Sequence, residues 1–249
     1  IKKILSLGAI IITLILTKNL YIIIAAYFLA LVVPNAIFFH RIKKIYQSNN
    51  NKDPDALTYG KSLSLMQIMS LVAAELDKIM VFQFIGATEL AIYSFAVAPT
   101  EQIKGFTKNI NSLAMPKFSG KDINEIKKGI RNKIIILGIG TTILVGAYIV
   151  MAPLFFGLLF PKYTGSVIYS QVLSISIIGA VLSSFLYTIL ESQKAKKQIY
   201  NFNLYGNTFS IVTMFPLIFY FGIWGIIVSR IISRFFVMFY TLYLVKSIK

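Results

Sequence analysis

The chain has 249 residues, 57% of them hydrophobic and 14% charged, and 25 Lys and Arg against 9 Asp and Glu give a net charge of +16. Soluble domains are about 45–50% apolar and about 25% charged, so this composition excludes an ordinary globular enzyme, a disordered chain and a solvated nucleic-acid-binding protein. The absence of Cys and the presence of a single His, His40, exclude thiolate and multi-histidine metal sites. We expect neither catalytic residues nor a cofactor.

Apolar segments follow one another along the chain. A membrane helix needs about 20 mostly apolar residues. Eight segments are candidates: 4–17, 20–39, 62–85, 90–112, 134–155, 167–190, 201–221 and 226–245. They are longer than barrel strands and apolar on all sides. The sequence therefore predicts an all-α integral membrane protein, a polytopic bundle of eight transmembrane helices.

Basic residues concentrate in alternate connections. Twenty Lys and Arg lie at the two ends of the chain, in the loops 40–61, 113–133 and 191–200, and in the adjoining end of segment 90–112. The opposite side carries only two, Lys18 and Lys162. By the positive-inside rule, both termini and the basic loops are cytoplasmic. The segment 121–133 has Ile123, Ile126 and Ile130 on one helical face. It is interpreted either as a helix lying on the anionic lipid surface or as a solvated basic loop.

Ionisable residues also occur inside the predicted spans, where a charge costs about 2.5–3.5 kcal/mol. The candidate substrate or ion pathway comprises Glu75, Asp77, Lys78, Glu101, Lys104, Arg230 and Arg234. Two interpretations stay open. In the first, the charges pair and lock a helical hairpin: Lys78 pairs with Glu75 or with Glu101, and Lys104 pairs with Glu101. In the second, some of the charged residues line a cavity that binds substrate or a coupling cation, H⁺ or Na⁺.

The two arginines of the last span lie at i and i+4, on one helical face. Arg230 either reaches outward to the membrane surface or faces the cavity, whereas Arg234 lies two turns deep. A cavity lined by Arg234, Lys78 and Lys104 would attract an anionic headgroup such as a pyrophosphate. Pro99 removes a helical hydrogen bond two residues before Glu101 and is the predicted hinge.

Several short motifs occur in a characteristic order among the spans. Asp77-Lys78 is followed by Gly86 and Tyr93 in the third and fourth spans. Further along are Pro116, Phe156-Gly157 with Tyr163 after a longer spacing than usual, Gln193-Lys194 with Lys196, and Gly222-Ile-Trp-Gly225. In this order and spacing the chain resembles the polysaccharide (oligosaccharide) flippases of the multidrug/oligosaccharidyl-lipid/polysaccharide exporter superfamily.

The resemblance implies two six-helix lobes that rock about a central cavity and carry a lipid-linked oligosaccharide across the bacterial cytoplasmic membrane. Residues 1–39 are then the last two helices of the first lobe, 40–61 the cytoplasmic linker and 62–249 the second lobe. Because the first residue is Ile, we expect a C-terminal fragment of a longer protein. The alternatives are a lipid II or multidrug exporter of the same superfamily, and a non-transporting membrane scaffold for polysaccharide synthesis. The expected partners are the lipid-linked oligosaccharide, membrane lipids and the coupling cation, with no nucleic acid.

Overall fold

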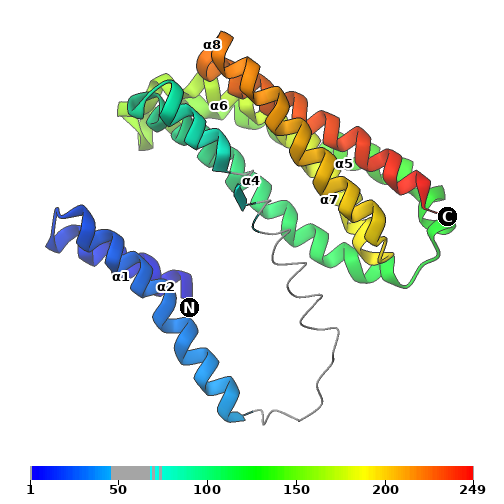
Figure 1. Ribbon diagram of the computed structural model, residues 1–249, viewed down its shortest axis with the longest axis horizontal. Helices are drawn as coiled ribbons and strands as arrows, with labels where there is room; N and C mark the ends of the chain where they lie inside the picture. The colour runs from blue at the N-terminus through cyan, green and yellow to red at the C-terminus, as the bar shows by residue number, and fades with distance from the viewer. Residues whose placement is uncertain (1, 46–67, 69–70, 73–74, 249) are drawn as a thin grey trace. The chain divides into compact units, whose positions relative to one another are not determined.

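The computed structural model describes residues 2–45, 68, 71–72 and 75–248 (Figure 1). All regular structure in these ranges is helical. The chain divides into two compact units, Ile1–Tyr59 and Gly60–Lys249. The division falls inside the segment predicted as a linker, 40–61, while the assignment of the units to two lobes of a transporter stays a prediction.

The first unit is a helical hairpin of α1 (Lys2–Leu16) and α2 (Leu20–Ile45). Asn19 caps α2, because its side-chain oxygen accepts a hydrogen bond of 3.0 Å from the backbone N–H of Tyr21. Among the side chains that the structure describes in this unit, nearly all of the large apolar ones are exposed; Tyr21, for example, is 83% exposed. Such a surface requires lipid or protein to cover it.

In the second unit, residues 75–84 are helical. Gly86 has a φ of 136°, a backbone conformation that favours glycine, and α4 (Ala87–Ser119) starts directly after it. The turn between the two helices therefore consists of Ile85 and Gly86. The helix α4 continues through Pro99, so a hinge at that residue stays a prediction.

The helix α5 (Ile123–Leu159) starts within the segment predicted as a surface helix or a loop, and Asp122 caps it by accepting from the backbone N–H of Asn124. The interpretation as a loop is therefore wrong, whereas the predicted helix with an apolar face is present. Ile123, Ile126 and Ile130 are buried in an apolar cluster with residues of the helices α7 (Ser176–Ser192) and α8 (Lys196–Ser247). The apolar face of the segment is therefore covered by protein, because the ends of two other helices reach the same level.

The predicted span 167–190 is a bent pair of helices. After the short helix η1 (Pro161–Ser166), α6 (Val167–Ser174) and α7 (Ser176–Ser192) follow each other, and the pair is bent by 43° at the break. The chain therefore changes direction at Ile175, next to the helices that carry the ionisable residues.

The last helix, α8 (Lys196–Ser247), reverses at Gly222, whose φ is 56°. The Thr213 hydroxyl lies 3.1 Å from that of Ser229, so residues 196–221 and 223–247 form two antiparallel arms (Figure 1). The arms approach so closely that a Cβ on Gly225 would lie 1.8 Å from the backbone oxygen of Leu217. Glycine is therefore required at residue 225.

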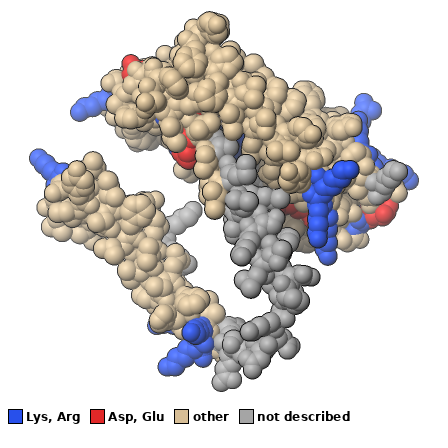
Figure 2. Space-filling view, viewed as in Figure 1, with Lys and Arg blue, Asp and Glu red and all other residues tan. Residues whose placement is uncertain are grey.

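Three helices of the described part, α2, α5 and α8, are long and apolar enough to cross a membrane, or four if the bent pair counts as one span. The chain is thus a membrane-embedded helical protein, but eight transmembrane helices are not confirmed. The helix α1 has only 15 residues, and ten of the 24 residues of the predicted span 62–85 lie outside the described residues. On the visible face, most basic side chains lie toward the ends of each unit, and most of the surface between them is uncharged (Figure 2).

Two apolar clusters position the site within the second unit. One contains Tyr93 and Val97 of α4 together with Ile226 and Ile227 of α8. The other contains the ends of the same two helices, including Phe118 and Leu244. Glu101, Lys104, Arg230 and Arg234 lie between these clusters along the chain. The charged residues therefore form a polar layer between two apolar cores.

Candidate functional site

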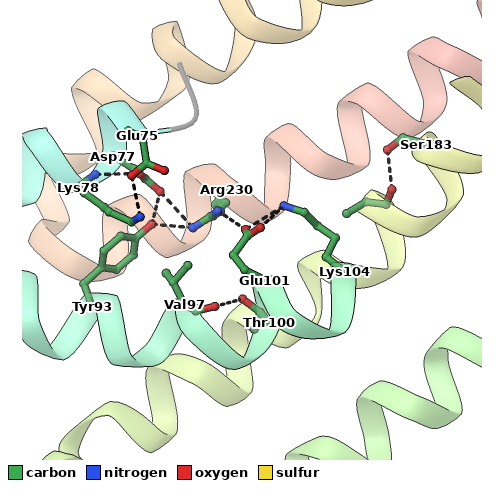
Figure 3. Close-up of polar contacts among 11 residues, drawn as sticks. Glu75, Asp77, Lys78, Tyr93, Val97, Thr100, Glu101, Lys104, Ser183 and Arg230 are labelled. Carbon is green, nitrogen blue, oxygen red and sulfur yellow. Dashed lines mark hydrogen bonds and ion pairs between the residues drawn. The ribbon is translucent and has the colours of Figure 1, made fainter. Parts of the chain in front are cut away.

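Arg230 joins three helical segments. Its Nη1 lies 3.1 Å from Oδ2 of Asp77, in the helical residues 75–84, and its Nη2 lies 2.5 Å from Oε1 of Glu101, in α4 (Figure 3). The Arg230 side chain is only 17% exposed and that of Asp77 only 11%. Arg230 therefore turns inward, which settles the choice between an outward-reaching and an inward-facing side chain.

Tyr93 completes the surroundings of the Asp77 carboxylate. Its hydroxyl donates a hydrogen bond of 2.6 Å to Oδ2 of Asp77 and accepts one of 3.1 Å from Nη1 of Arg230. The backbone N–H of Lys78 donates to the other carboxylate oxygen at 2.8 Å. Buried charges persist in proteins when they are paired and hydrogen-bonded in this way.

Two local ion pairs that the spacing allows are present. Nζ of Lys78 lies 2.7 Å from Glu75, and Nζ of Lys104 lies 2.7 Å from Glu101. The third pair considered, Lys78 with Glu101 across the hairpin, is not formed. Lys78 and Glu75 lie on an exposed face, at 39% and 59% exposure, while Glu101 bridges Arg230 and Lys104 instead.

A cavity of about 190 Å³ lies beside this network, against the two arms of α8. Its lining includes the charged side chains of Asp77, Arg230 and Arg234. The rest of the lining comprises four polar uncharged residues, Asn207, Ser210, Ser229 and Ser233, together with one glycine and four apolar residues. Of the seven predicted pathway residues, three therefore meet at this cavity.

A second cavity of about 610 Å³ lies among α4, α7 and α8. Its charged lining residues are Glu101, Lys104, Glu191 and Arg234. Arg234 lines both cavities, and so it forms part of the wall between them. The volume is within the range of about 300–1,000 Å³ typical of ligand pockets.

Arg234 differs from the other charges of the polar layer. Within the part of the chain that the structure describes, its guanidinium has no hydrogen-bond or ion-pair partner. In this layer the carboxylates of Asp77 and Glu101 face three cationic groups, those of Lys104, Arg230 and Arg234. One positive charge is therefore in excess, and it lies in the walls of both cavities.

The structure brings together five of the seven predicted residues. Asp77, Glu101, Lys104, Arg230 and Arg234 belong to one network or its cavities. Glu75 and Lys78 line neither cavity, because their helix turns them to the exposed face. The predicted contribution of Lys78 to an anion-binding wall beside Arg234 and Lys104 is therefore wrong for these two cavities.

Sequence reasoning missed two groups of residues. Tyr93 was recognised only as part of a motif, and its hydrogen bond to Asp77 joins positions 16 apart. On α7, the second cavity is lined by residues that recur every three or four positions: Ala180, Ser183, Ser184, Tyr187, Thr188 and Glu191. This helical periodicity of polar residues in an apolar segment is a signal that could have identified the stripe.

Comparison of the chain with protein-family models, with curated proteins and with solved structures finds no match.

Proposed function

We propose that this chain is part of a flippase that moves an undecaprenyl-pyrophosphate-linked oligosaccharide across the bacterial cytoplasmic membrane for cell-surface polysaccharide synthesis. The observation that carries the proposal is the unpartnered guanidinium of Arg234 in the walls of two cavities. A guanidinium matches phosphate oxygens with two parallel hydrogen bonds. Within an apolar environment, an uncompensated cation facing a cavity favours an anionic ligand.

In this proposal the chain supplies one lobe and part of another. Residues 1–39 are the last two helices of the first lobe, 40–61 the cytoplasmic linker and 62–249 the six-helix second lobe. The 20-to-2 distribution of basic residues supports an orientation with both ends of the chain in the cytoplasm. The resemblance of the motifs around Asp77-Lys78 and Gly222 to those of the flippase family supports the same assignment.

Transport occurs by alternating access, with the lobes rocking about the substrate, and no covalent bond is broken. A cation gradient of H⁺ or Na⁺ supplies the driving force. Asp77 and Glu101 are both held by Arg230, so a cation that bound at either carboxylate would have to compete with this guanidinium.

The charge balance also separates the alternative functions. An exporter of cationic drugs requires an excess of acidic groups in the cavity. Neither cavity has one: the first is lined by one carboxylate and two arginines, and the second by two carboxylates, one lysine and one arginine. A membrane scaffold without transport activity requires neither an unpaired Arg234 nor a cavity beside it. A lipid II exporter would carry a pyrophosphate as well and is therefore the second candidate.

Complementation with the full-length protein tests the proposal. In a strain lacking its own flippase, we expect Arg234→Gln to abolish most of the surface polysaccharide and Arg234→Lys to retain part of it. Removal of Arg234 leaves no carboxylate unpaired, so the variant should fold and its protein level should stay normal.

Arg131→Gln is the matched control, because Arg131 is an exposed residue of α5 remote in sequence from the network. It should leave surface polysaccharide unchanged. A wild-type level of polysaccharide from Arg234→Gln would refute the assigned role of this arginine and remove the main support for an anionic substrate.

A further inference from the structure

The second cavity has a polar stripe on α7 that the charged network does not use. Ser183, Ser184, Tyr187, Thr188 and Glu191 follow one another at helical spacing and all line the cavity. At a rise of 1.5 Å per residue, the stripe extends for about 12 Å along the helix axis. It lies in the cytoplasmic half of α7 by the predicted orientation, beyond the level of Lys104.

Contacts between α4 and α7 fix where this stripe lies relative to the charges. Nδ2 of Asn111 donates a 2.6 Å hydrogen bond to Oγ of Ser184, and Nε2 of Gln193 donates to the backbone oxygen of Phe118 at 3.0 Å. Residue numbers increase in the same direction along both helices at these contacts, so α4 and α7 run parallel. Glu101 and Lys104 are therefore at one end of the cavity and Glu191 at the other.

The chemistry of the two ends differs. The Lys104 and Arg234 end presents positive charge, whereas the other end presents hydroxyl and amide groups of Asn111, Ser184 and Thr188. Glu191 adds a carboxylate that has no hydrogen-bond or ion-pair partner among the described residues. Donors and acceptors are thus interspersed over this end of the cavity.

An aromatic surface lies beside these polar groups. The rings of Tyr187 and Phe202, both lining the cavity, are 4.6 Å apart between centroids and inclined at 41°. A wall that combines interspersed donors and acceptors with ring faces complements a ligand that has many hydroxyl groups and also apolar C–H surfaces. A sugar has both features, whereas a lipid chain lacks the hydroxyl groups and a phosphate lacks the C–H surface.

We infer that the end of the cavity formed by Asn111, Ser184, Thr188, Glu191 and the Tyr187–Phe202 ring pair is a sugar subsite that determines glycan preference. This inference rests on the proposed flippase function and divides its site into two parts. Lys104 and Arg234 hold the phosphate groups, and the sugar subsite hydrogen-bonds the hydroxyl groups of the attached glycan. A site built to hydrogen-bond substrate hydroxyls discriminates strongly against a ligand that lacks them.

Binding measured with two ligands tests the sugar subsite. The full-length protein in lipid nanodiscs is titrated with bare undecaprenyl pyrophosphate and with pyrophosphate-linked glycans extracted from the organism that encodes the chain. We expect the wild type to bind the glycan-linked carrier at least tenfold more tightly than the bare carrier. In Asn111→Leu/Glu191→Leu this ratio should fall by about tenfold, while the Kd for the bare carrier changes less than twofold.

Two further variants keep the measurement decisive. Glu191→Gln preserves size at an exposed position, so it should fold even if the double variant does not, and it should lower the same ratio. Arg234→Gln should weaken binding of both carriers by a similar factor and leave the ratio unchanged.

Each outcome has a distinct consequence. An unchanged affinity ratio in Glu191→Gln and in the folded double variant would overturn the sugar subsite. Equal affinity of the wild type for the two carriers would overturn it as well. In both cases the proposed flippase function would stand. If the wild type bound neither carrier, the proposed function itself would fail, and the subsite with it.

Discussion

Replacing Arg230 by Gln removes the group that joins Asp77 to Glu101, and we expect the protein to lose about 2–4 kcal/mol of stability. Breaking a buried ion pair by deleting one partner costs about 3–5 kcal/mol, because the other charge is left buried. Glu101 reduces this cost, since it is 40% exposed and keeps its ion pair with Lys104. Asp77 carries most of the penalty, because only the Tyr93 hydroxyl and one backbone N–H stay as its partners.

A double-mutant cycle isolates the contribution of the pair. Asp77→Asn removes the charge that Arg230→Gln leaves uncompensated, so the double variant should be more stable than the sum of the single losses predicts, by about 1–3 kcal/mol. Thermal unfolding of the purified full-length protein in detergent, followed by far-ultraviolet circular dichroism, measures all three variants against wild type.

Arg131→Gln serves as the reference for loss of an exposed arginine. If Arg230→Gln proved as stable as this reference, or if the effects of Asp77→Asn and Arg230→Gln simply added, the assignment of Arg230 as the centre of a buried network would be refuted.

Three substitutions test the packing that surrounds the site. Gly225→Ala places a Cβ 1.8 Å from a backbone oxygen and should destabilise the α8 hairpin by about 1–3 kcal/mol or more in the same unfolding assay. Its control, Gly146→Ala, should be neutral, because a Cβ at that residue meets no atom within 4 Å. Gly179→Ala places a Cβ 2.9 Å from the backbone of Arg234; displacement of this arginine should reduce surface polysaccharide in the complementation assay, and undiminished polysaccharide would contradict the assigned position. Ile126→Ala should cost about 2–5 kcal/mol because Ile126 is 4% exposed. A negligible change in melting temperature would instead favour a residue that faces lipid or water.

The helical segments could be predicted because each depends on a local run of residues. The segments 134–155 and 201–221 lie within α5 and the first arm of α8. The bend at Ile175 could not be found in this way, since 167–190 contains neither a proline nor a charged residue to mark a boundary. Similarly, the sequence pattern of 121–133 indicates an amphipathic helix but does not specify whether protein or lipid covers its apolar face.

Most residues of the candidate site could be predicted from the sequence, but fewer of the contacts between them could. Glu101 with Lys104 and Glu75 with Lys78 pair at i, i+3, which the spacing alone permits. The pairing of Arg230 with Glu101 joins residues 129 positions apart, and it depends on how α8 is rotated about its axis and in what register it meets α4.

Composition and local pattern by themselves determine that this protein is helical and membrane-embedded, that its basic residues are segregated by loop, and that ionisable residues occur within its apolar segments. These properties follow from the free energy of transferring individual side chains into lipid, which depends on residue type. Only the tertiary structure decides that Arg230 is neutralised by Asp77 and Glu101 while Arg234 is left facing two cavities. The reason is geometric: two arginines one helical turn apart differ in their ion pairs because the carboxylates of other helices reach the level of the first and not of the second.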